Sequence, residues 1–157
     1  MNKIIHSKIN KDPFDFIVIN DFFPNFNNND NYQSIINFFK SYDFILDIEE
    51  KFKLKPWSLI YNNYEIITSS PGSFISYNNH NNNKNVLYIF LFLNENYNDN
   101  NGGQLHLLNS FSKTVEFIIK PEFNKLVIFT VSDKTFFGFN INKNNFFNKY
   151  LKVNYYY

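Results

Sequence analysis

The sequence predicts one mostly β domain, a sandwich or barrel with a helical flank. The chain has 157 residues, which is enough for one domain with a substantial core. Short stretches rich in β-branched and aromatic residues, separated by turn signals, follow one another through residues 57–157. Helical spacing of apolar residues is confined to the N-terminal third. We therefore expect residues 1–157 to form a single domain, in which residues 1–56 supply an N-terminal strand and the helices.

The N-terminal third contains one strand and one clear helix. Residues 14–26 (FDFIVINDFFPNF) alternate apolar and polar positions before a turn at Pro24, which indicates a strand and then a break. Residues 31–42 (NYQSIINFFKSY) place apolar side chains at helical spacing, with Asp30 or Ser34 as candidate caps. Residues 42–56 are rich in charge and are compatible with a second helix or with a loop that ends before Pro56.

The remaining strands are predicted from apolar stretches bounded by Gly, Pro, Asn and Ser. Residues 86–93 (VLYIFLFL) form a continuous apolar run, which is typical of a strand buried on both faces. Residues 69–72 indicate a turn, and residues 94–101 a polar loop that ends at Gly102-Gly103. The predicted strands cover residues 57–67, 73–77, 86–93, 104–108, 114–119, 125–131, 135–139 and 150–157.

Composition narrows the function classes. The formal net charge of +1 predicts neither nucleic-acid binding nor binding to an anionic membrane surface. The absence of cysteine excludes disulfides and thiolate metal sites. The N-terminus lacks a secretory signal, and the longest apolar run is too short to span a bilayer, so we expect a soluble intracellular protein.

Every basic residue is lysine or histidine, and asparagine, lysine, isoleucine, phenylalanine and tyrosine dominate. This bias is typical of an AT-rich genome. Without arginine, an anion must be held by lysine, by backbone N–H groups or by hydroxyls, and no bidentate guanidinium is present for a carboxylate.

Five segments are informative when taken in order: residues 13–26 (PFDFIVINDFFPNF), 72–94 (GSFISYNNHNNNKNVLYIFLFLN), 100–108 (NNGGQLHLL), 121–139 (PEFNKLVIFTVSDKTFFGF) and the closing YLKVNYYY. Together they resemble the prolyl-4-hydroxylase-like branch of the iron(II)- and 2-oxoglutarate-dependent dioxygenases. They are similar to the family's entry strand, first metal motif, "GGEL" turn, "H-G" segment and last core strand. The resemblance implies a double-stranded β-helix, a jelly roll of about eight strands supported by helices.

The resemblance also implies an iron(II) site formed by an H-x-D pair and a second histidine, with 2-oxoglutarate anchored by a basic residue of the last strand. In this sequence Asn78 stands at the first histidine position, His80 at the aspartate position and Phe137 at the second histidine position. Asn148 stands at the basic position, and Phe92 replaces a tyrosine that often contacts 2-oxoglutarate. Each polar position of the implied site is therefore changed.

Each histidine has two interpretations. His80 is either a residual metal ligand or an ordinary loop residue in an asparagine run, and the second is favoured. His106 lies on a predicted strand and is favoured as structural, while His6 lies in an N-terminal segment that we expect to be mobile. Lys149 is adjacent to Asn148 but is expected to point to the opposite face of its strand.

Phe137, placed beside Phe92 and Tyr77, is expected to fill the former iron cavity with aromatic rings. An apolar pocket for a small ligand is the alternative. The 21 phenylalanines, 11 tyrosines and one tryptophan also leave rings for the surface, where a protein partner can bind.

These observations favour a catalytically inactive member of the family that acts as a binding or scaffold module, with no cofactor. The alternative is an active iron(II)/2-oxoglutarate hydroxylase of a prolyl residue or small molecule. That alternative requires a non-standard ligand set: His80 as the first ligand, Asn82 in place of the aspartate, and His106 as the third.

Overall fold

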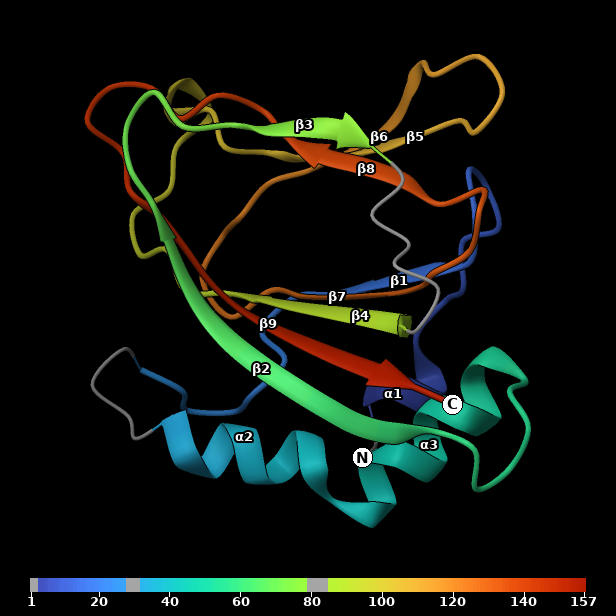
Figure 1. Ribbon diagram of the computed structural model, residues 1–157. Helices are drawn as coiled ribbons and strands as arrows, with labels where there is room; N and C mark the ends of the chain where they lie inside the picture. The colour runs from blue at the N-terminus through green and yellow to red at the C-terminus, as the bar shows by residue number, and fades with distance from the viewer. Residues whose placement is uncertain (1–2, 28–31, 79–84) are drawn as a thin grey trace.

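The computed structural model describes residues 3–27, 32–78 and 85–157. Within these residues, strands form two facing antiparallel sheets (Figure 1). The larger sheet contains β1 (Phe16–Ile19), β2 (Ile60–Ser69), β4 (Asn85–Phe92), β7 (Leu126–Thr130) and β9 (Asn148–Tyr156). The smaller sheet contains β3 (Ile75–Asn78), β5 (Leu105–Leu108), β6 (Val115–Ile119) and β8 (Phe136–Phe139).

The strand order is β1-β7-β4-β9-β2 in the larger sheet and β3-β8-β5-β6 in the smaller one. Consecutive strands therefore cross repeatedly from one sheet to the other, and the two sheets enclose a common interior. The mostly β class with flanking helices is confirmed.

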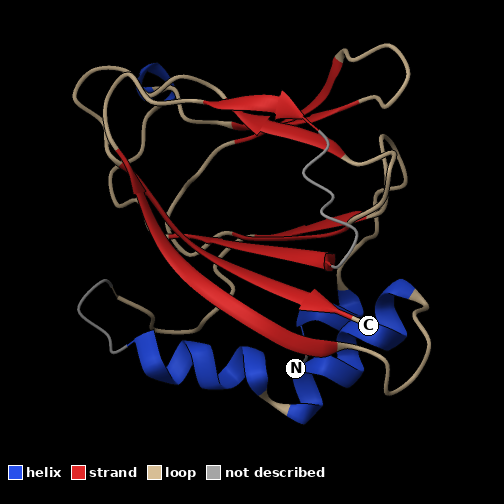
Figure 2. Cartoon of the chain, viewed as in Figure 1, coloured by secondary structure: helices blue, strands red, loops and turns tan. Residues whose placement is uncertain are grey.

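Of the helices in the described residues, three α-helices cover the outer face of the larger sheet (Figure 2). They are α1 (Lys3–His6), α2 (Tyr32–Lys40) and α3 (Tyr42–Phe52), and a short 3-10 helix, η1 (Asp99–Asn101), lies in the loop after β4. Residues 42–52 are thus helical, which decides between the two predictions for that segment. The N-terminal segment that contains His6 forms α1, whose Ile4 is buried in the core, so the expectation of a mobile N-terminus was wrong. Ser34 lies inside α2 and is not its cap, and Asp30 lies outside the described residues.

Side-chain alternation divides the core into two layers. On β4, Leu87, Ile89 and Leu91 pack in the layer between the larger sheet and the helices. Tyr88, Phe90 and Phe92 point the other way, into the layer between the two sheets. Both faces of β4 are therefore buried in apolar surroundings, and this explains why residues 86–93 are apolar throughout and do not alternate with polar residues.

The end of α3 is fixed to the start of β2 by one buried carboxylate. Glu49 is 2% exposed and accepts the backbone N–H groups of Trp57, Ser58 and Leu59, each at 2.8 Å. Trp57 has a φ of 63° and its side chain is 72% exposed, so the clamp holds it in a left-handed conformation at the surface.

Asparagine occupies many of the tight turns. The left-handed asparagines are Asn25, Asn96, Asn124, Asn144 and Asn145, with φ between 52° and 58°. The whole chain has only four glycines, and asparagine is the side chain that best tolerates this conformation.

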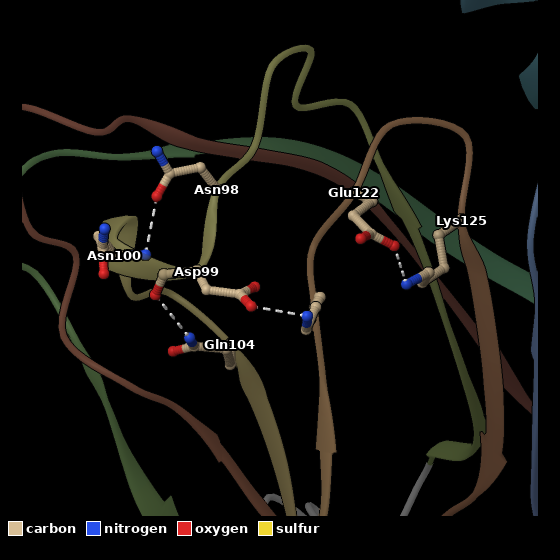
Figure 3. Close-up of polar contacts among 7 residues, drawn as sticks. Asn98, Asp99, Asn100, Gln104, Glu122 and Lys125 are labelled. Carbon is tan, nitrogen blue, oxygen red and sulfur yellow. Dashed lines mark hydrogen bonds and ion pairs between the residues drawn. The ribbon is translucent and has the colours of Figure 1, made fainter.

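Polar contacts fasten the loops at the end of the barrel where β4 leads to β5 (Figure 3). The Asn98 side chain accepts the N–H of Asn100 at 2.8 Å, and the Gln104 amide donates to the carbonyl of Asp99 at 3.4 Å. Glu122 and Lys125 form an ion pair beside this loop. We call this the β4–β5 end, and the opposite end, where β3 finishes and β4 begins, the β3–β4 end.

Candidate functional site

The implied metal site falls at the β3–β4 end of the barrel. Asn78 is the last residue of β3 and is the register partner of Phe137 on β8. The structure therefore brings two of the three predicted metal positions together across one strand pair. The third, His80, lies outside the described residues.

Phe137 is the buried member of this pair. Its side chain is 3% exposed and points into the layer between the sheets. Its ring centroid lies 5.1 Å from that of Phe129, 5.8 Å from Tyr88 and 5.9 Å from Phe90. The sequence predicted an aromatic filling, but Tyr77 is not part of it. Tyr77 is 49% exposed and lies across Gly138, where an added Cβ would come within 2.5 Å of its ring.

These side chains do not fit an iron(II) centre. A phenyl ring has no lone pair to donate, and an exposed asparagine offers one neutral oxygen instead of an imidazole. Among residues 3–27, 32–78 and 85–157, no group of three His, Asp or Glu side chains is arranged to hold a metal ion.

His106 points away from this site. Its neighbours Leu105 and Leu107 are buried between the sheets, so the imidazole lies on the outer face of the smaller sheet. There its Nδ1 is 2.7 Å from the Tyr77 hydroxyl, and the two rings stack with centroids 5.6 Å apart. Burial lowers the pKa of His106 below its usual value. This position gives the imidazole a structural partner and removes it from the interior.

Asn148, at the predicted 2-oxoglutarate position, is part of a buried amide cluster at the β4–β5 end. It is 1% exposed, donates to the carbonyl of Gly103 at 2.9 Å and accepts from Asn94 at 2.9 Å. Asn94 also accepts the backbone N–H of Lys149 at 2.7 Å. Both polar groups of the Asn148 amide are thus satisfied within the protein.

Phe92 and Lys149, the other residues considered for 2-oxoglutarate binding, also make contacts within the protein. Phe92 is fully buried and packs against Phe139 and Tyr150, and burial raises the pKa of Tyr150 to about 12. The Lys149 ammonium lies on the helical side of the sheet, 3.0 Å from the Tyr32 hydroxyl, as expected from strand alternation.

Sequence reasoning missed Lys152, a half-buried charge on the inner face of the larger sheet. It lies on the same face of β9 as Asn148 and Tyr150. It follows Asn148 by four residues and is nearer the β3–β4 end. Its ammonium lies over the Tyr88 ring, 4.7 Å from the centroid. Burial lowers the pKa of this lysine, and the neighbouring Glu65 carboxylate opposes that shift. Counting alternate positions from Asn148 would have placed Lys152 in the interior.

Comparison with known protein structures identifies the fold of this chain. No family model and no curated protein matches the sequence. A prolyl-4-hydroxylase of Pseudomonas putida has a similar structure, with a TM-score of 0.62 and 14% identity over 90% of this chain and 86% of that one. The chain has the fold of the 2-oxoglutarate- and iron(II)-dependent oxygenases. The predicted double-stranded β-helix is therefore confirmed.

Two further structures agree with this fold. A prolyl 4-hydroxylase of Phytophthora capsici gives a TM-score of 0.63 at 16% identity, over 90% of this chain and 58% of that one. An oxidoreductase of the 2OG-Fe(II) oxygenase family from Burkholderia pseudomallei gives 0.63 at 11% identity, over 90% and 66%. This chain thus spans less than two thirds of both these proteins.

Among the described residues, each helix falls short of the length and apolar character that crossing a membrane requires.

Proposed function

We propose that this chain is a catalytically inactive relative of the prolyl-hydroxylase-like oxygenases and acts as a binding or scaffold module. The observation that carries the proposal is the position of Phe137, which packs on three other rings where the resemblance requires a histidine. A ring held by such packing has no route to metal coordination and fills space that an open catalytic site needs.

The arrangement of the other candidate residues supports the same function. Asn148 is neutral and hydrogen-bonded where the family's basic residue would be, and His106 bonds to Tyr77 on the outer face. The active alternative requires His106 as a metal ligand. For that, β5 would have to shift its register by one residue, so that its inward and outward side chains exchange faces.

The binding role also has surface residues available to it. Trp57 is 72% exposed and packs against the half-exposed Tyr42, with the two rings tilted and their centroids 4.8 Å apart. Aromatic residues are enriched in the cores of protein interfaces, and we propose that a protein partner binds at this pair.

Iron retention tests the proposal. We expect the purified chain, incubated with Fe²⁺, ascorbate and 2-oxoglutarate, to retain no stoichiometric iron and to form no succinate. The matched variant Asn78→His/His80→Asp/Phe137→His rebuilds the family's triad at the proposed positions and is expected to retain iron.

Two results would overturn the proposal. Stoichiometric iron in the natural chain that is lost in His80→Ala would show that a working site exists. A folded triple variant, verified by circular dichroism, that fails to bind iron would show that these three positions are not the metal positions.

A further inference from the structure

The edge of the larger sheet at β1 is open beside the N-terminal segment. β1 is the outer strand of this sheet, and β7 is its neighbour on the inner side (Figure 1). On the outer side, Asn10 and Phe16 exchange two backbone hydrogen bonds, of 2.8 and 3.0 Å. Continued along both segments, this antiparallel register would place Lys8 opposite Val18. The segment before Asn10 instead leaves the edge and leads back to α1, so the two segments separate after one pair.

A pocket of about 520 Å³ lies between the separated segments. It is lined by residues between Lys3 and Asn10 on one side and by Val18, Ile19 and Asn20 on the other. We call it the β1 pocket. Its volume is within the range of protein ligand sites, so the gap has room for a short segment of another chain.

Both walls of the β1 pocket are held in place by the protein itself. The Lys51 ammonium of α3 donates to the backbone carbonyl of Ile5 at 2.7 Å and to that of Ser7. Ile4 of α1 is buried in the layer between the larger sheet and the helices. The opposite wall, β1, pairs with β7 from Phe16 to Ile19. Walls that are already ordered reduce the entropy cost of binding.

The backbone of Val18 faces the β1 pocket. Alternate residues of an edge strand direct their N–H and C=O groups to opposite sides. Phe16 bonds outward to Asn10, whereas the Asp15 carbonyl accepts from Thr130 of β7. Val18 therefore faces outward like Phe16, and its N–H and C=O groups have no hydrogen-bond partner among the described residues. An open edge of this kind can pair with an added extended peptide.

The charge of the β1 pocket favours an acidic partner. Lys3, His6 and Lys8 line it, and none of its described lining residues is acidic. The Lys3 ammonium donates to the Asp21 carbonyl. The side chains of His6 and Lys8 are exposed, and within the described part of the chain neither forms an ion pair. Because the net charge of the whole chain is only +1, this is a local excess of basic groups, which attracts a partner of opposite charge.

We propose that the β1 pocket binds an extended acidic peptide segment of a partner protein by strand addition to β1. The peptide forms the antiparallel pair with Val18 that Lys8 does not make. Side chains alternate along the peptide, so the two that flank the residue opposite Val18 point to the face of Ile17 and Ile19. The helix α1 lies on that side of the sheet, and we therefore expect Asp or Glu at these two peptide positions.

NMR titration of the isotope-labelled full chain, without added iron, tests the proposal. The probe is the blocked pentapeptide acetyl-Thr-Glu-Val-Glu-Thr-amide, whose valine is designed to pair with Val18. We expect saturable binding with a Kd on the order of 1 mM and a large shift of the Val18 N–H signal. The N–H groups of Ile17 and Ile19 already face β7 and should shift less.

Three control ligands separate strand pairing from charge attraction. The same peptide with an N-methylated valine cannot donate to the Val18 carbonyl and should bind about tenfold more weakly. Acetyl-Thr-Lys-Val-Lys-Thr-amide reverses the charge, and inorganic phosphate is an anion without a peptide backbone. Both are expected to bind more weakly than the acidic peptide.

Two variants test the contribution of charge. Lys8→Met keeps the length of the side chain and removes its charge, and it should weaken binding of the acidic peptide by about threefold or more. Lys143→Met removes the same charge at an exposed position of the β8–β9 connection, outside the pocket. This matched control should bind the peptide like the natural chain.

The absence of a saturable Val18 shift would overturn this site. Equal binding of the N-methylated peptide would overturn strand addition. Equal binding of the lysine peptide or of inorganic phosphate, or unchanged binding by Lys8→Met, would overturn the acidic-peptide class. This inference goes beyond the proposed function, because the β1 pocket lies at the sheet edge and its test involves no iron. A chain that retains no iron and ignores the peptide would remove this inference alone.

Discussion

At the scale of single residues, His106 shows how burial sets the favoured charge state. The imidazole is 8% exposed and its Nδ1 lies against the Tyr77 hydroxyl, which can donate to it while the ring is neutral. Burial lowers its pKa, so the folded protein holds the neutral form to a lower pH than the unfolded chain does.

This shift predicts a pH-dependent stability. Because the pKa is lowered in the folded state, the contribution is fully present above the unfolded value of about 6.5 and is lost as the pH falls towards the lower folded value. We expect the urea midpoint to fall between about pH 7.5 and about pH 5.5, and His106→Asn to reduce that fall.

The exposed His6 provides the control for this measurement. His6→Asn should keep the pH dependence of the natural chain. If His106→Asn kept the same dependence, another group would be responsible for it.

At the scale of elements, single polar side chains fasten neighbouring segments where the chain changes direction. Glu49 joins the end of α3 to the start of β2 through three backbone N–H groups. Asn94 joins the end of β4 to the start of β9 through Asn148 and the backbone of Lys149. Each clamp satisfies groups that would otherwise be buried without partners.

Glu49→Gln tests the first clamp. The substitution replaces one acceptor oxygen by an NH₂ donor facing backbone N–H groups, and we expect a loss of about 2–3 kcal/mol in the free energy of unfolding. The emission of Trp57, the only tryptophan, should change at the same time because its backbone loses the clamp. The adjacent Glu50→Gln, at an exposed position, should leave both unchanged, and equal effects of the two substitutions would contradict the clamp.

The sequence predicted most elements because apolar periodicity depends on which faces are buried. The nine strands of the described residues lie within or close to the predicted stretches, and η1 lies within the predicted polar loop. The helix α1 was missed because four residues are too few to show a period. Tyr77 was wrongly placed inside because an irregular register between Ile75 and Asn78 changes which face it occupies.

The candidate site was less predictable than the strands. The resemblance assigned Asn78 and Phe137 to one site, and in the structure these two residues are register partners on β3 and β8. The surroundings of Lys152 depend on its cross-strand partner Glu65 on β2, which a single sequence does not reveal. The side-chain contacts of Asn154 and Tyr88 likewise follow from tertiary packing alone.

At the scale of the whole molecule, the interior between the sheets is a continuous aromatic cluster. Phe90 contacts Phe129, Phe137, Phe139 and Tyr150, with centroid distances between 5.5 and 5.9 Å. Edge-to-face pairs at this spacing add to the free energy of burying the rings. The same rings that occupy the implied catalytic space therefore hold the two sheets together.

Phe137→Ala tests this structural role. Removing a buried ring from the cluster should lower the free energy of unfolding by about 3–5 kcal/mol, measured by chemical denaturation. Phe111→Ala, at a side chain that is 96% exposed, is the matched control and should change stability by less than about 0.5 kcal/mol. Similar stabilities of the two variants would mean that the cluster does not hold the sheets together.

The left-handed asparagines have a consequence for the unfolded chain. Glycine at those turns would relieve local strain in the folded state but would give the unfolded backbone many more conformations to lose on folding. A chain with four glycines and with asparagine in these turns starts from a more restricted ensemble. The chain therefore loses less conformational entropy on folding than a chain with glycine in these turns would, and this contributes to the stability of the barrel.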